Sequence, residues 1–339
     1  MRSLLDISAT TDAIEDLADW VEISTFFHDD RTVSQEDLVR SLVRAGGDRA
    51  EQSAREKAIE AFDELSSRES AMGSDVAAFP FSSYPFEVDG DVLKRTAEPF
   101  DSSNTGLLYA FLLAITRASM DSKSRRLNEI NPTILFEELC AESLCQFWGG
   151  RSALADVFVT GTSNRSIPPG ATRRFPRLID ALARHLHEGL GWKAGAISPG
   201  AGDGGLDLAV WRKFQDKRPG NLVGFAQCKT GEHWRDHLGR HNPRSISTRF
   251  FSARIVLAPL PIYMVPCRVS LDEWTHVMEQ HSGLLFDRCR IAHFGTYTSS
   301  AIVKNCETWL NAAINREMNG LIERGLRSAP VPIASGRIR

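Results

Sequence analysis

Two strand-like segments joined by a short turn constrain the fold of this chain more than any other feature. They read LDLAVWRKF at 206–214 and NLVGFAQCK at 221–229, and the residues between them include Pro219 and Gly220, which are typical of turns. Antiparallel pairing of the two segments is therefore expected. In such a hairpin the start of the first strand lies beside the end of the second.

The strand ends that meet in this hairpin carry polar residues. Because alternate residues of a strand point to the same face, Gln227 and Lys229 project together at the end of the second strand. Ala226 and Cys228 face the other way, and their small apolar side chains suit packing under a helix. Asp207 begins the first strand beside them. A strand core does not need an acid and an amine here, so the sequence predicts a reactive site at this end of the hairpin.

The remaining segments indicate the fold around the hairpin. Helices are expected at 10–23, 34–46, 54–70, 105–120, 134–148, 175–192, 233–241, 270–283 and 305–325, further strands at 192–198, within 253–265 and at 284–294, and a loop over 149–171. Helix, three strands, helix, strand predicts an α/β fold with a central mixed sheet flanked by helices. We expect a mainly helical domain at 1–130, the sheet domain at 131–325 and a disordered basic tail at 326–339.

Charge is unevenly distributed along the chain. Residues 1–130 contain 14 Lys and Arg against 25 Asp and Glu, a net charge of −11, whereas residues 131–339 have a net charge of +8. Opposite signs in the two halves favour two modules. A basic half is compatible with a polyanionic partner, although a lopsided solvated surface explains the same numbers.

Several protein classes do not fit the sequence. The six cysteines form no CxxC pair, which argues against a zinc ribbon or a secreted disulfide framework. No apolar run reaches the length of a membrane span, and the acidic N-terminus has no signal-peptide pattern. There is neither a GxxxxGK[ST] phosphate-binding loop nor a GxSxG nucleophile elbow. A soluble cytoplasmic protein without a membrane partner is expected.

The polar residues of the hairpin resemble a known nuclease pattern. Gly205, Asp207, Gln227 and Lys229 are similar to the GxD strand start and following QxK of the PD-(D/E)xK nuclease superfamily, and most similar to its Mrr-like restriction endonuclease branch. The resemblance covers about residues 134–295, and the first 130 residues resemble no family. It implies a restriction-endonuclease-like fold.

The resemblance also implies a metal-dependent phosphodiester hydrolase. Asp207 and Glu137 would bind Mg²⁺, with Mn²⁺ as a substitute, and Lys229 would orient the attacking water and stabilise charge on phosphorus. Gln227 in place of an acid weakens metal binding and favours a single-metal mechanism. Glu137 follows an aromatic residue on its helix, as the family's glutamate often does. Glu142 and Glu188 are the alternatives, and a solvated helix flank is the plain explanation for Glu137 and Glu142.

DNA is the expected substrate. Arg235, Arg240 and Arg244 follow the QxK strand and are candidate phosphate contacts, although surface arginines would give the same pattern. By resemblance, the protein would act in bacterial restriction or anti-phage defence, with a possible homodimer and a partner protein bound by the N-terminal domain. Two alternatives stay open: an inactive nuclease fold that binds nucleic acid or scaffolds a complex, and a small-molecule enzyme on an unrelated α/β fold.

Overall fold

A computed structural model describes most of the chain. It covers residues 4–7, 13–46, 51–72, 84–96, 105–118, 126–160, 175–197, 205–231 and 233–323. The tail expected at 326–339 lies outside these ranges.

The N-terminal part combines helices with a small antiparallel sheet. Its elements are α1 (Ile14–Ser24), β1 (Thr32–Ser34), α2 (Gln35–Gly46), α3 (Glu51–Met72), β2 (Phe86–Asp89), β3 (Val92–Arg95) and α4 (Thr105–Arg117), and the strand order is β1-β3-β2. The four helices expected here are confirmed. Ser34 and Asp37 exchange hydrogen bonds at the start of α2, so this helix begins with a reciprocal cap.

The second part is built on a mixed five-stranded sheet. Its main elements are α5 (Pro132–Phe147), β4 (Ala155–Val159), α6 (Phe175–Leu186), β5 (Leu208–Arg212), β6 (Leu222–Cys228), α7 (Pro243–Phe250), β7 (Leu260–Met264), α8 (Leu271–His281), β8 (Leu284–Phe286), α9 (Arg288–Phe294) and α10 (Ser300–Glu323). The strand order is β4-β5-β6-β7-β8. The first two pairings are antiparallel and the last two are parallel, so the expected α/β class with a mixed sheet is confirmed.

The first strand of this sheet is not where the sequence indicated. We expected it at 192–198 and a loop over 149–171, but the edge strand is β4, inside the expected loop. Residues 192–197 form no strand: Trp192 makes an isolated bridge to Phe251, and Gly195 has a φ of +79° that turns the chain. As a result, α5 is the helix that precedes the first strand of the sheet.

Two other expected elements are shorter than predicted. The helix at 233–241 is only a short 3-10 turn over Trp234–His237, and α7 follows it unpredicted. The strand at 284–294 ends after Phe286, because Asp287 accepts a hydrogen bond from the backbone N–H of Arg290 and begins α9.

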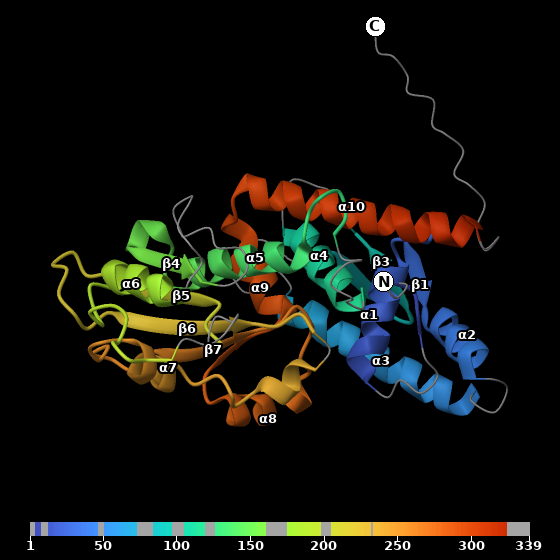
Figure 1. Cartoon of the computed structure of the whole chain (residues 1–339). Coiled ribbons are helices and arrows are strands. Elements are labelled where there is room, and N and C mark those ends of the chain that lie inside the picture. The colour runs from blue at the N-terminus through green and yellow to red at the C-terminus, as the bar shows by residue number, and fades with distance from the viewer. Residues whose placement is uncertain are drawn as a thin grey trace, which may run out of the picture.

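Helices cover both faces of the sheet. One face, with Leu208 and Ala226, joins a hydrophobic cluster that also contains buried residues of α1, α3, α4, α5 and α10. The other face, with Trp211 and Phe225, packs against α6 and α7 in a second cluster. Figure 1 shows α10 lying along α5 and α4, which links the sheet to the N-terminal helices. None of the described helices is both long and apolar enough to span a lipid bilayer.

A buried ionic network fastens the N-terminal helices to the sheet domain. Arg288 of α9 binds the Asp19 carboxylate of α1 at 2.6 Å, and Arg68 of α3 binds Asp19 at 2.7 Å and Glu22 at 3.0 Å. Burial alone would raise the pKa of Asp19, but the two guanidinium groups lower it well below its ordinary value. The network lies deep in the protein, between segments more than two hundred residues apart in sequence.

Candidate functional site

The site expected at the hairpin forms where β5 begins and β6 ends. The antiparallel register pairs Leu208 with Ala226, and the backbone N–H of Asp207 donates to the carbonyl of Ala226 at 3.0 Å. Asp207 therefore lies beside Gln227, one position beyond the last pair of the ladder. The predicted meeting of these two strand ends is confirmed.

Asp207 completes the ladder with its side chain. Its Oδ2 accepts a hydrogen bond from the backbone N–H of Cys228 at 2.8 Å, where β5 no longer supplies a carbonyl. This contact explains how an acid with only 6% of its surface exposed is held at a strand end. It also fixes the carboxylate next to the backbone of the QxK segment. Gly205, with a φ of +81°, turns the chain into this position.

Helix α5 runs antiparallel to β6 across the sheet. Near one end of the pair the thiols of Cys140 and Cys228 are hydrogen-bonded, and near the other Trp148 packs against Gly224. The two contact positions on α5 are eight residues apart, a rise of about 12 Å along a helix. Those on β6 are four residues apart, about 13 Å along a strand, so the spacing of the contacts matches on the two elements. Glu137 precedes Cys140 by one turn and is thus carried to the end of β6.

Glu137 and Asp207 affect the pKa values of the same cysteine thiols, which indicates that the two carboxylates lie close together. Burial raises the pKa of Cys140, and both carboxylates raise it further. Desolvation and the hydrogen bond with Cys140 hold the pKa of Cys228 well above its usual value, and the same two carboxylates add to this rise. After burial, Asp207 is also the largest cause of the raised pKa of Tyr263 on β7. Two buried carboxylates from different elements therefore both raise the pKa of the Cys140 and Cys228 thiols.

The alternative glutamates are held elsewhere. Glu142 forms an ion pair with Arg151 at 3.0 Å near the start of β4. Glu188 lies at the turn end of the hairpin, where its Oε1 accepts hydrogen bonds from the N–H groups of Gly220 and Asn221 at 2.7 and 2.9 Å. Of the three glutamates considered from the sequence, only Glu137 lies near Asp207.

By strand alternation, the side chains of Gln227 and Lys229 project from the face of the sheet opposite α5. Gln227 lines a pocket of about 230 Å³ together with Gly205 and residues of the 237–250 segment. Lys229 continues the strand, because its backbone N–H donates to the carbonyl of Met264 at 3.0 Å. Its ammonium group forms no salt bridge with any residue in the described ranges.

The three arginines expected to contact DNA have different surroundings. Arg240 lines the pocket beside Gln227. Arg235 is bound to the Glu273 carboxylate, with Nη2 and Oε2 2.7 Å apart, and its guanidinium lies 4.5 Å from the ring centre of Trp234. Arg244 is exposed in the first turn of α7 and does not line the pocket. The structure therefore does not gather the three into one surface.

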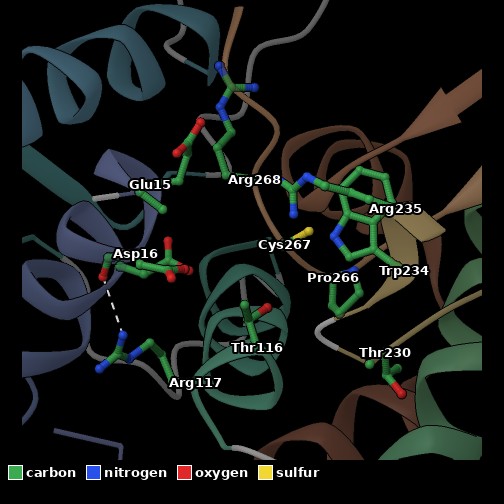
Figure 2. A pocket seen from close by; sticks show the side chains of 13 residues that line it. Glu15, Asp16, Thr116, Arg117, Thr230, Trp234, Arg235, Pro266, Cys267 and Arg268 are labelled. Carbon is green, nitrogen blue, oxygen red and sulfur yellow. Dashed lines mark hydrogen bonds between the residues drawn. The ribbon is translucent and has the colours of Figure 1, made fainter. Parts of the chain in front are cut away.

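Beyond Lys229 the chain borders a second hollow, which we call the α1 cleft. It has a volume of about 360 Å³ and lies between α1, the end of α4, and the loops at 230–235 and 266–268. Figure 2 shows Glu15 and Asp16 on one side of this cleft and Trp234 and Arg235 on the other. Acidic side chains of the N-terminal part thus stand next to the end of the QxK strand.

The donor atoms at the site suit a hard cation. Asp207 and Glu137 offer carboxylate oxygens, which Mg²⁺ prefers, and this ion commonly uses one or two carboxylates while water and substrate phosphate complete its shell. In the described parts of the chain, no group of three or more His, Cys, Asp or Glu side chains is placed to hold a metal. Two carboxylates are within the number that Mg²⁺ commonly takes from a protein.

Sequence reasoning missed the thiol contact that aligns the helix. Cys140 lies three residues after Glu137, and Cys228 lies on the small apolar face of its strand, so two complementary small positions were visible in the sequence. Searches of protein-family models, curated proteins and solved structures found no match to this chain. The functional interpretation therefore rests on the geometry of these residues.

Proposed function

We propose that this protein is a divalent-metal-dependent DNA endonuclease. The observation that carries the proposal is the meeting of Asp207, Gln227 and Lys229 at one end of the hairpin, with Glu137 brought there by α5. Two acids, an amide and an amine are the groups that the PD-(D/E)xK resemblance implies. Glu137 and Asp207 both influence the buried thiols of Cys140 and Cys228, and Gln227 and Lys229 follow on the adjoining strand end, which supports the proposal.

The arrangement of elements supports a restriction-endonuclease-like core. Helix α5 precedes the three antiparallel strands β4, β5 and β6, and α7 then connects β6 to the parallel strand β7. The expected order of helix, three strands, helix and strand differs from this one, because α6 lies between β4 and β5 in the chain. The candidate site lies at the ends of the central strands, where such a sheet exposes its polar residues.

The residues divide the chemistry of phosphodiester hydrolysis among them. Asp207 and Glu137 would hold Mg²⁺, which supplies Lewis-acid stabilisation of charge on the phosphate oxygens. The Lys229 ammonium would donate to a phosphate oxygen and orient the attacking water. Gln227 adds an amide without a third negative charge, which limits the repulsion between the site and the phosphate.

Substitution of Lys229, Asp207 and Glu137 tests the proposal. Plasmid and linear DNA are incubated with purified protein in Mg²⁺, in Mn²⁺ and in EDTA. We expect cleavage only with metal, and a fall of about 10²-fold or more in its rate for Lys229→Ala, Asp207→Asn and Glu137→Gln. Thermal melts of each variant separate lost chemistry from lost folding.

Matched controls define the outcome. Glu142→Gln changes a glutamate on the same helix and should leave the cleavage rate within about twofold of wild type, as expected for a surface ion pair. Metal-dependent cleavage that persists in both Lys229→Ala and Asp207→Asn would contradict the site. A folded wild type that binds DNA and cleaves none with either metal would favour the inactive nucleic-acid-binding subunit instead.

A further inference from the structure

The pocket beside Gln227 has a distinct composition, and we call it the arginine pocket. It is lined by Gly205, Gln227, His237, Arg240, His241, Asn242, Ser245, Ile246, Arg249 and Phe250. Among the described residues, this lining contains two guanidinium groups and two imidazoles but no carboxylate. Gln227 belongs both to this pocket and to the candidate site, so the two share a wall.

Arg240 and Arg249 have other contacts in the part of the chain that the structure describes. Arg240 Nη1 lies 3.5 Å from His237 Nδ1, and the Arg249 guanidinium lies 5.1 Å from the ring centre of Phe250. Within the described ranges, neither arginine is paired with a carboxylate. Both side chains are exposed, so both guanidinium groups are accessible to an anion.

The α1 cleft on the other side of Lys229 has the opposite character. Glu15 and Asp16 line it (Figure 2), and the guanidinium groups of Arg235 and Arg268 are held by Glu273 and Asp287. The third arginine of the cleft, Arg117, donates to the backbone carbonyls of Leu4 and Asp16, so an incoming phosphate would meet acids and arginines that already have partners. A polyanionic strand is therefore favoured on the side of the arginine pocket.

We propose that the arginine pocket binds one phosphate group of the DNA. This phosphate is the one next along the strand to the phosphodiester that is cleaved. The inference rests on the proposed function, because it takes Lys229 as the residue at the cleaved bond. Gln227 and Lys229 are two residues apart, about 6.6 Å along an extended strand, so the pocket and the cleavage position are close neighbours. Arg240 and Arg249 bind the phosphate oxygens, and this contact sets the register of the strand at the site.

DNA binding without catalysis tests the pocket. A short fluorescein-labelled duplex is titrated in EDTA at several KCl concentrations, and its anisotropy is recorded. For Arg240→Gln/Arg249→Gln we expect the dissociation constant to rise about tenfold or more. The slope of log affinity against log salt should fall in magnitude by about 1 to 2. Arg218→Gln, an exposed arginine near the turn of the hairpin, is the matched control and should leave both quantities unchanged.

A competition experiment tests whether the two phosphate positions are adjacent. Thymidine 3′,5′-bisphosphate carries two phosphates one nucleotide apart, and thymidine 5′-monophosphate carries one. The bisphosphate should displace the labelled duplex from wild type at a lower concentration than the monophosphate. This advantage should disappear in Arg240→Gln/Arg249→Gln.

The outcomes separate this inference from the proposed function. Wild-type affinity and salt slope in the double variant would overturn the pocket, even where metal-dependent cleavage is intact. Equal competition by the two nucleotides against wild type would overturn the adjacent position. Binding that depends on both arginines, in a protein that never cleaves, would instead refute the endonuclease and retain the pocket as an anion site.

Discussion

Glu188 and Asp207 are both buried carboxylates that accept backbone hydrogen bonds at the hairpin, but they lie at opposite ends of it. Glu188 receives N–H groups from Gly220, Asn221 and Val256, so both of its oxygens serve the fold. Asp207 accepts the N–H group of Cys228 and lies beside the QxK segment. Burial alone therefore does not mark a functional acid, whereas the groups that surround it do.

Substitution of Glu188 should affect stability without affecting cleavage. In Glu188→Gln an NH₂ group replaces one of the two carboxylate oxygens. Each oxygen accepts a backbone hydrogen bond, so the amide nitrogen faces a backbone donor in either orientation and leaves a buried N–H group unsatisfied. We expect the free energy of unfolding to fall by about 1–3 kcal/mol in urea denaturation. Cleavage by the folded variant should match wild type. A variant that is as stable as wild type but inactive would assign Glu188 to the site and contradict its structural role.

At the scale of elements, the sequence predicted the centre of the sheet domain better than its edges. The hairpin was predictable because alternation, turn residues and polar ends agree over two long segments. The edge strand β4 was missed because five residues, ADVFV, carry too little pattern to distinguish a strand from a loop. The segment starting at Trp192 has similar composition, but Gly195 turns it away from the sheet. Helix α9 was missed because one capping residue, Asp287, ended an apolar run that otherwise continued.

The same limits apply to the candidate site. Asp207, Gln227 and Lys229 follow from strand phase, which is a local property of the chain. The choice among Glu137, Glu142 and Glu188 depends on how α5 and α6 pack on the sheet. That packing is set by contacts between distant residues, and no periodicity in the sequence reveals it.

The docking of α5 on β6 depends on Gly224. A Cβ atom at this position would lie 2.5 Å from Ile262 Cδ1, closer than packed atoms tolerate, and 3.2 Å from Trp148 Cζ2, which is a tight contact. We expect Gly224→Ala to lower the free energy of unfolding by about 1–3 kcal/mol, because it overpacks a filled interface. Cleavage should also fall, since a displaced α5 moves Glu137 away from Asp207.

A glycine in open space provides the comparison. Gly231 has no atom within 4 Å of its Cβ position, so Gly231→Ala should leave the urea midpoint nearly unchanged. Equal midpoints for Gly224→Ala and wild type would mean that α5 does not lie against the strand in solution as described.

At the scale of the whole molecule, the boundary expected near residue 130 separates two regions of composition that share one core. Helix α4 of the first region is buried against α9 and α10 of the second. The buried guanidinium of Arg288 has its carboxylate partners, Asp19 and Glu22, on α1. Net charge reflects the exposed residues of each region. It gives no information about the core that the two regions share.

We therefore expect a fragment spanning 131–323 not to fold independently. Its α9 would carry Arg288 into the interior without Asp19 or Glu22, and removing one side of a buried ion pair costs about 3–5 kcal/mol. The apolar face that α4 covers would be open to water as well. Urea denaturation followed by near-ultraviolet circular dichroism should show no cooperative transition for the fragment and a single one for the full chain. In the full chain, Asp19→Asn should lower the midpoint more than Glu142→Gln, because only the first substitution leaves buried arginines short of negative charge. A fragment that unfolds cooperatively and cleaves DNA would show that the acidic region is a separable module, which is the arrangement that charge distribution alone favours.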